Sequence, residues 1–222
     1  FQELGKPIKT VDRAISRTIP VNEIDENLLG RLYKEEFRSR MNNSEDEREF
    51  VAYLNILVRS MTKDSEKPFD YEVFLFSGSP NAFALPGGVI GITKAMTDLV
   101  KNEAQLVALL GHEIGHIERG HCFDSSRGEL LARKLGANNP VSITLDIMSS
   151  FTRMSFSKSQ ESEADEFAFS LMLKQKYEPL QMSEVFSSLL KLHASERTNF
   201  SPLSDFLASH PLLETRVKSF RS

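Results

Sequence analysis

The residues from Leu109 to His121, LLGHEIGHIERGH, include three histidines and a glutamate directly after the first of them. His112 and His116 are four residues apart, so on a helix their side chains lie on the same face. Two imidazoles at this spacing can bind one zinc ion. Glu113 is rotated by about 100° from His112, so it can lie beside the metal and act as a general base. The pattern therefore predicts a zinc site with His112 and His116 as ligands.

A catalytic zinc needs a third protein ligand and an open fourth position. His121 is a poor candidate, because it follows His116 by five residues where the related three-histidine pattern needs six. Cys122 adjoins the expected helix end and would have to fold back sharply. For both side chains we favour a structural or surface role.

The acidic stretch SQESEADEF, residues 159–167, offers a better third ligand. Glu161 and Asp165 are four residues apart and share a helix face, whereas Glu163 points away from it. Glu161 can bind the metal, and Asp165 can accept the other ring N–H of a ligating histidine, which fixes the orientation of that ring. Alone, such a stretch is usually only a solvated helix face. Together with HEIGH it predicts one Zn²⁺ per chain.

Helix and turn signals show how these residues are positioned. Asn102 with Gln105 resembles a capping box and Gly120 a C-terminal stop, so residues 103–119 form the expected histidine helix. Before it, β-prone residues at 71–76, 81–85 and 89–92 predict a small sheet, with a Pro86-Gly87 turn between the last two strands. Further helices are expected at 124–135, 140–153, 160–174, 180–194 and 212–221.

Two more helices are expected before the sheet. Asn22 caps the first, whose expected apolar face is Ile24, Leu28, Leu32 and Met41. Ser44 and Glu47 form a capping box for the second, whose apolar face is Phe50, Leu54, Leu57, Val58 and Met61. One small sheet followed by helices predicts an α+β fold. We expect a single domain over 1–222, with N-terminal helices in 1–65 and a catalytic core in 70–221.

The composition is that of a soluble globular domain, with 222 residues, 40% hydrophobic and 26% charged. A net charge of −4 does not indicate a surface that binds nucleic acid. The single cysteine excludes an internal disulfide and a zinc site built on several thiolates. The longest apolar runs are too short to span a membrane. The start at Phe1 leaves open a removed signal or membrane anchor.

HEIGH followed by ESEAD resembles the gluzincin metallopeptidases of the HtpX and CAAX-prenyl-protease family, with its Ste-type and Oma-like members and its soluble bacterial relatives. NAFALPGG, residues 81–88, and SHPLLETR, residues 209–216, also agree with this family. The resemblance runs from about Tyr71 to Arg221 and does not include the N-terminal helices. It implies a mostly helical, minigluzincin-like zincin domain whose small sheet lines the active-site cleft with an edge strand.

The resemblance also implies roles for individual residues. His112, His116 and Glu161 would bind zinc, Glu113 would be the general base, and Asp165 would be the hydrogen-bond partner of a ligating histidine. His210 would lie near the metal, either to stabilise the transition state or as a fourth ligand that blocks the resting site. Arg216 would brace this segment against an active-site carboxylate. The expected substrate-binding strand, which would add a peptide to an unpaired sheet edge, consists of Asn81, Ala82, Phe83, Ala84 and Leu85.

The expected function is therefore that of a zinc endopeptidase for extended or misfolded polypeptides. The expected location is the cell envelope or periplasm of a bacterium, with the cytoplasm as the alternative. The stretch PVSITLDIMSSFTRMSF is too short to span a membrane, which argues against prenylated substrates processed inside a membrane. Two other functions stay open: a chaperone-like zinc protein with little proteolysis, and a zinc hydrolase of a small amide. The sequence does not fix the oligomeric state.

Overall fold

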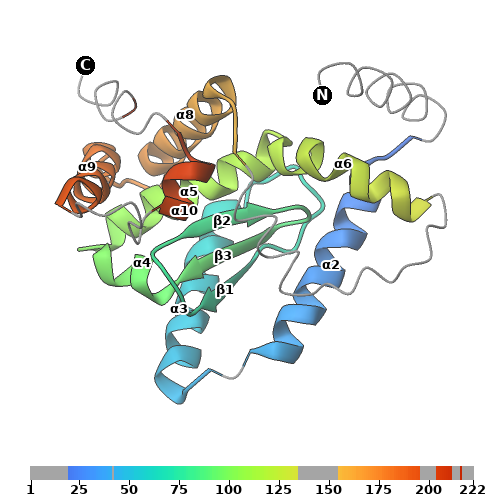
Figure 1. The fold of residues 1–222 in the computed structure, drawn as a ribbon, viewed down its shortest axis with the longest axis horizontal. Coiled ribbons are helices and arrows are strands. Elements are labelled where there is room, and N and C mark those ends of the chain that lie inside the picture. Colours follow the sequence, from blue (N-terminus) through green and yellow to red (C-terminus); the bar gives the residue numbers. More distant parts are fainter. Residues whose placement is uncertain (1–19, 42, 135–154, 196–203, 212–215, 217–222) are drawn as a thin grey trace, which may run out of the picture.

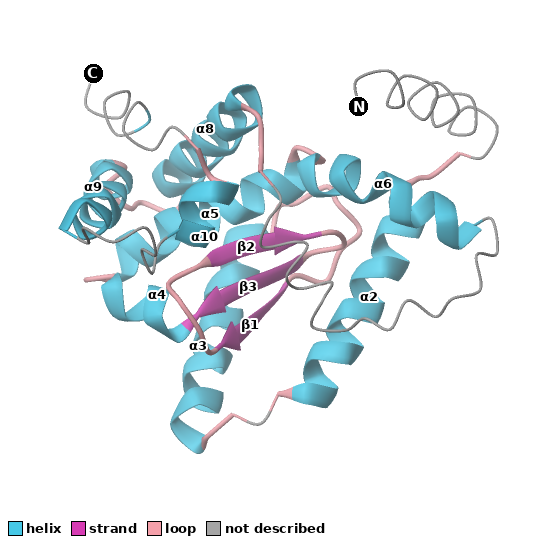
Figure 2. Cartoon of the chain, viewed as in Figure 1, coloured by secondary structure: helices cyan, strands magenta, loops and turns pink. Residues whose placement is uncertain are grey.

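The structure is a computed structural model that describes residues 20–41, 43–134, 155–195, 204–211 and Arg216. This part of the chain is mostly helical and contains one three-stranded sheet, which confirms the α+β prediction (Figures 1 and 2). Two helices precede the sheet and six follow it. In chain order the elements are α2 (Glu23–Arg40), α3 (Glu45–Thr62), β1 (Glu72–Phe76), β2 (Ala82–Leu85), β3 (Val89–Thr93), α4 (Lys94–Leu99), α5 (Glu103–Glu118), α6 (His121–Lys134), α8 (Lys158–Lys174), α9 (Leu180–Ser195) and α10 (Ser204–Ser209).

The sheet has the strand order β1-β3-β2, with β1 parallel and β2 antiparallel to β3. Both of its faces are covered. Val73 and Ile90 belong to a core that also contains apolar residues of α3 and α5. Phe74 and Val89 belong to a second core that contains apolar residues of α2 and α6. Because helices cover both faces, all the residues of β2 and β3 are buried, instead of every second one.

The N-terminal helices agree with the sequence in their caps but only partly in their faces. Both predicted capping positions are confirmed, at Asn22 for α2 and at Ser44 with Glu47 for α3. Of the expected face of α3, Leu54, Leu57, Val58 and Met61 are buried as predicted, whereas Phe50 is half-buried. The expected face of α2 is wrong, because Ile24 is 74% exposed and Leu28 is 51% exposed. Instead Tyr33 and Phe37 turn inward, where Phe37 packs edge-on against Phe74 with ring centroids 5.3 Å apart.

The helix that carries the histidines, α5, begins as predicted and ends one residue before the predicted end, at Glu118. Asn102 accepts a hydrogen bond from the backbone N–H of Gln105, and Gly120 ends the helix with a φ of 78°. Glutamates hold both ends in place. Glu103 accepts from Tyr53 Oη at 2.6 Å and Tyr177 Oη at 2.5 Å, and Glu118 accepts from Tyr71 Oη at 2.5 Å. Between these ends, residues 105–117 are buried.

The later helices agree with the prediction within a few residues. Helix α6 begins three residues early, at His121, because the chain turns at Gly120 directly into the next helix. The helix expected at 140–153 lies outside the described residues, and of 212–221 only Arg216 is described. The short helix α10 was not predicted. Among the described helices, none combines the length and the apolar character that crossing a membrane requires.

Candidate metal centre

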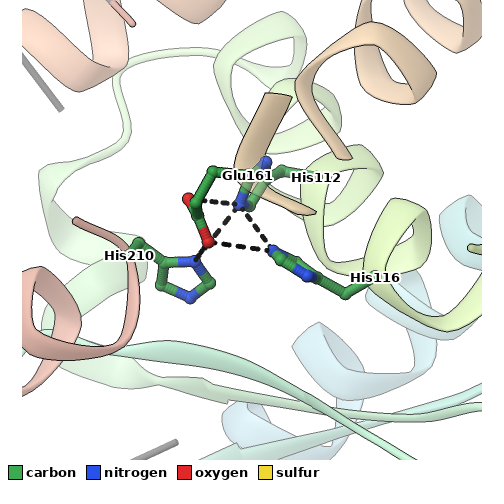
Figure 3. Close-up of side chains that lie close together, drawn as sticks. All are labelled: His112, His116, Glu161 and His210. Carbon is green, nitrogen blue, oxygen red and sulfur yellow. Dashed lines mark hydrogen bonds and ion pairs between the residues drawn. The ribbon is translucent and has the colours of Figure 1, made fainter. Parts of the chain in front are cut away.

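Four buried side chains from three parts of the chain meet next to α5. His112 and His116 come from α5, Glu161 comes from α8, and His210 directly follows α10 (Figures 1 and 3). Each offers one nitrogen or oxygen, and these four atoms all lie within 4.8 Å of one another. The structure thus brings together the three expected ligands and the histidine whose part was left open.

The spacing of these atoms fits a four-coordinate metal. A tetrahedral zinc with bonds of 2.0–2.2 Å places its ligand atoms roughly 3.3–3.6 Å apart. His112 Nε2 lies 3.1 Å from His116 Nε2, and Glu161 Oε1 lies 3.4 Å from His116 Nε2. His210 Nδ1 lies 3.2 Å from both His112 Nε2 and Glu161 Oε1. Two or three imidazoles with one carboxylate are also the donor types that zinc prefers.

Glu113 lies next to this group without joining it. Its side chain is completely buried, and neither carboxylate oxygen has a hydrogen-bond partner among the described residues. His210 Nε2 lies 3.5 Å from Glu113 Oε1. A buried carboxylate without hydrogen bonds costs stability, so such groups in native proteins commonly mark a functional site. The donor set and this carboxylate together fit a bound metal with an acid–base group beside it.

Asp165 and Arg216 hold the outer side of the group. His112 Nδ1 lies 2.9 Å from Asp165 Oδ1, as the spacing of Glu161 and Asp165 on one helix face suggests. Arg216 donates two hydrogen bonds to Asp165, at 2.6 and 2.7 Å, and a third to Glu161 Oε2. Its guanidinium also lies 4.7 Å from the ring centroid of Phe186. These contacts tie Arg216, which follows α10 in the chain, to α8.

At Glu161, Asp165 and His116 the electrostatics favour the charge states that a divalent cation needs. Burial raises the pKa of Glu161, but the charge of His210 and a hydrogen bond from His116 outweigh it and keep the pKa well below its usual range. Burial also raises the pKa of Asp165, and the contacts with His112 and Arg216 reverse that effect. Burial lowers the pKa of His116 well below its usual value, which favours the neutral imidazole. Neutral imidazoles and ionised carboxylates are the forms that bind metal.

Aromatic rings and a further histidine complete the surroundings, and the sequence did not point to them. Phe156 stacks on His116 with ring centroids 3.8 Å apart. Phe206 of α10 lies against His210, with centroids 4.7 Å apart. His121 faces the ring nitrogen of His116 that points away from the donor group, at 3.0 Å. For His121, the only signal in the sequence was its position just after the helix stop.

The expected substrate strand is one of the two edge strands of the sheet. Within the described residues β2 pairs with β3 alone, and it lies against α5. Asn81 precedes the strand and has a buried backbone N–H that donates to Thr93 Oγ1 at 2.9 Å. All four side chains of Ala82–Leu85 are buried. Any contact of this strand with a peptide would therefore involve its backbone.

An α+β domain with two histidines on one buried helix and a carboxylate beside them from another helix has the architecture of a metallopeptidase, an enzyme that hydrolyses peptide bonds. A comparison with protein-family profiles gives the particular family, because residues 45–222 match peptidase family M48. The chain belongs to this family. The match includes α3, which the resemblance seen in the sequence, starting near Tyr71, left out.

Curated relatives are similar over much of the chain. The mitochondrial metalloendopeptidase OMA1 of Saccharomyces cerevisiae is 26% identical over 151 residues, which are 64% of this chain and 43% of the relative. The metalloprotease YcaL of Escherichia coli is 25% identical over 166 residues, 69% of this chain and 61% of the relative. The metalloprotease LoiP of Escherichia coli is 24% identical over 189 residues, 81% of this chain and 71% of the relative. The chain thus spans less than two thirds of the first two relatives.

Proposed function

We propose that this chain is a zinc-dependent endopeptidase that cleaves extended or misfolded polypeptides. The observation that carries the proposal is the group of four donor atoms, which lie within 4.8 Å of one another, beside the buried carboxylate of Glu113. That carboxylate has no hydrogen-bond partner among the described residues. Membership of family M48 supports the peptidase activity. Within that family we propose an Oma-like member of the HtpX and CAAX-prenyl-protease group, supported by similarity to OMA1 proteins of yeast and Arabidopsis thaliana.

In this proposal His112, His116 and Glu161 hold the zinc. When bound there, zinc lowers the pKa of a coordinated water to about 7 and polarises the scissile carbonyl. Glu113 accepts the proton of the attacking water and passes it to the leaving amine. Asp165 keeps the ring of His112 in place, and Arg216 keeps Asp165 in place through its two hydrogen bonds.

The free edge of β2 is the proposed binding site for the substrate backbone. An extended peptide can add to such an edge by main-chain hydrogen bonds. Because the side chains of Ala82–Leu85 are buried, this edge selects an extended backbone and contributes little to sequence preference. Extended or misfolded polypeptides meet that requirement, whereas folded proteins do not.

We further propose that the described conformation is latent, with His210 as the fourth ligand. The ligand groups, Glu113 and His210 are all at most 1% exposed, so a polypeptide cannot reach them. A zinc site closed by four protein ligands leaves no position for water or substrate. Cleavage would then require movement of α10 and His210 away from α5.

The proposal of a general base is tested by Glu113→Gln. Glutamine has nearly the same shape but cannot accept the proton, so we expect a loss of casein cleavage of about 10²-fold or more. Zinc content, measured by atomic absorption, should stay near one per chain, because Glu113 is not a ligand. Wild-type cleavage by the variant would remove Glu113 from this role. If both the wild-type protein and the His210→Ala variant bind zinc but cut no polypeptide, the result favours the chaperone-like alternative.

Location and partners complete the proposal. We propose a protein of the cell envelope whose partner is its polypeptide substrate. The support is the similarity to a beta-barrel assembly-enhancing protease of Escherichia coli, 24% identical over 191 residues. Fractionation of cells that produce the natural full-length protein tests the location.

A further inference from the structure

A chain of polar contacts leads from His116 away from the donor group. The Nε2 atom of His116 faces His112 and Glu161, whereas its Nδ1 lies 3.0 Å from His121 Nδ1. On its other side, His121 Nε2 lies 3.3 Å from Glu163 Oε2. His121 is buried, at 3% exposure, while Glu163 lies at the surface of α8. Helices α5, α6 and α8 thus contribute one residue each.

We propose that His121, supported by Glu163, is a positioning residue that sets the orientation and tautomer of His116. The proposal rests on the zinc-binding function of His116 proposed above. If Nε2 of His116 binds the metal, its proton must be on Nδ1, which can then donate only to His121. His121 accepts through Nδ1, so its own proton is on Nε2 and is donated to Glu163. Each ring in this chain has a single tautomer that satisfies every contact.

The hydrogen bond does what the aromatic packing around His116 cannot do. Phe156 stacks on the face of the ring, with an interplanar angle of 24°, and so holds the ring plane. A rotation of the imidazole by 180° about its Cβ–Cγ bond leaves the ring plane and the stacking unchanged, but it places a carbon where Nε2 was. It would also leave a buried ring N–H without a partner, which costs about 1–3 kcal/mol. The contact with His121 therefore distinguishes the ligating orientation from the flipped one.

The backbone explains why His121 can make this contact although it is a poor ligand by spacing. Gly120 has a φ of 78°, a left-handed conformation that favours glycine, and α6 starts at the next residue. This turn places His121 beside the outer edge of the His116 ring instead of at the metal. His112 has a different partner at the corresponding atom, the buried Asp165. The two proposed ligands on α5 are thus oriented by separate groups. Asp165 of α8 contacts His112 directly, whereas Glu163 of α8 acts on His116 through His121 of α6.

Zinc affinity and the cobalt spectrum test this proposal without relying on activity. The protein variants are His121→Ala, His121→Gln, Glu163→Gln and, as the matched control, Glu166→Gln on the exposed face of the same helix. The zinc dissociation constant is measured by competition with a chromogenic chelator, and the visible spectrum is recorded with Co²⁺ in place of zinc. We expect His121→Ala to weaken zinc binding about 10–100-fold and to change the cobalt bands. His121→Gln should recover part of the affinity, because its amide oxygen can accept the same N–H.

Glu163→Gln should weaken zinc binding less, because the carboxylate is half exposed, and Glu166→Gln should leave the affinity unchanged. Wild-type zinc affinity and cobalt bands in folded His121→Ala would overturn the proposal. If His121→Ala does not fold, Glu163→Gln decides, and wild-type affinity and spectrum in that variant would overturn it. If wild-type protein binds no zinc, the proposed function itself fails, and that outcome is distinct from a variant that binds as tightly as wild type.

Discussion

At the scale of the residue, the two ring nitrogens of His210 contact two different parts of the centre. Its Nδ1 belongs to the donor group, and its Nε2 lies 3.5 Å from Glu113, the proposed base. One side chain thus occupies both the fourth coordination position and the space next to the base. Burial lowers its pKa, but the charges of Glu113 and Glu161 outweigh burial and raise it. Because His210 occupies both positions, removal of its imidazole should open the centre.

We expect His210→Ala to increase casein cleavage in the presence of one equivalent of zinc. If the closed state holds about nine tenths of the molecules, the gain is about tenfold. Ala208→Ser, an exposed change on α10, is the matched control and should leave the rate as it is. A fall in activity with unchanged zinc content would instead assign His210 to the stabilisation of the transition state.

Residue spacing predicted the grouping at the centre better than it predicted the surroundings. HEIGH on one helix and ESEAD on another carry their own geometry, because residues four apart on a helix share a face. The contact of His121 with His116 depends on the backbone turn at Gly120, and the contact of Phe156 with His116 joins residues that are far apart in the sequence. Neither contact produces a periodic pattern in the sequence. Spacing alone therefore indicated that His121 is a poor ligand and gave no sign of its contact with the ligand.

At the scale of the element, the contact between α5 and α8 sets the position of Glu161 relative to the two histidines. Two glycines of α5 face α8 at different distances. A Cβ built on Gly115 would lie 2.8 Å from the carbonyl oxygen of Ala164, whereas one built on Gly111 would lie 3.5 Å from Ala168. The first distance is too short for any side chain, and the second is ordinary contact. The helices are therefore closest at Gly115.

This difference predicts opposite effects of two similar changes. Gly115→Ala forces α8 away and should lower the free energy of unfolding by about 1–3 kcal/mol. Gly111→Ala meets no clash and should keep or raise stability by up to about 1 kcal/mol, because alanine favours the helix. Urea unfolding of the metal-free proteins measures both. Equal effects of the two changes would show that the close approach at Gly115 does not limit the packing.

The sequence predicted which segments form elements more reliably than which face is buried. In α2 two stripes of apolar residues compete for the buried face. Tyr33 and Phe37 are buried instead of Ile24 and Leu28, because Phe37 packs against Tyr33 and against Phe74 of the sheet. A single-sequence pattern ranks apolar residues without knowing the shape of the surface that receives them. The caps at Asn22 and Ser44 were predictable since they depend on neighbours within one turn.

At the scale of the whole molecule, another buried carboxylate lies outside the donor group, where α2 contacts the turn between β2 and β3. Glu26 is 1% exposed, and its Oε1 accepts a hydrogen bond from Gly87 N at 3.4 Å. Its Oε2 has no hydrogen-bond partner among the described residues. Burial raises the pKa of Glu26 to about 7. The charge of this group therefore opposes folding near neutral pH.

The raised pKa predicts a change of stability with pH. Below about pH 4.5 the carboxyl is protonated in both the folded and the unfolded state. Between pH 4.5 and 7 only the unfolded state releases the proton, so stability falls as the pH rises, by at most about 3 kcal/mol. The Glu26→Gln variant should not lose this stability between pH 4.5 and 7, because glutamine has no proton to release. Urea unfolding at several pH values checks it, and parallel curves for the two proteins would contradict the raised pKa.

The order of the four donors along the chain has a consequence for how the protein is made. Helices α5 and α8, which supply His112, His116 and Glu161, are both complete before His210 is synthesised. If His210 closes the site, the nascent chain passes through a stage that has the open three-donor site and lacks the residue that covers it. Metal can enter during that stage, and closure follows translation of the last donor. The donors of α5 and α8 would then be able to bind metal before His210 covers them.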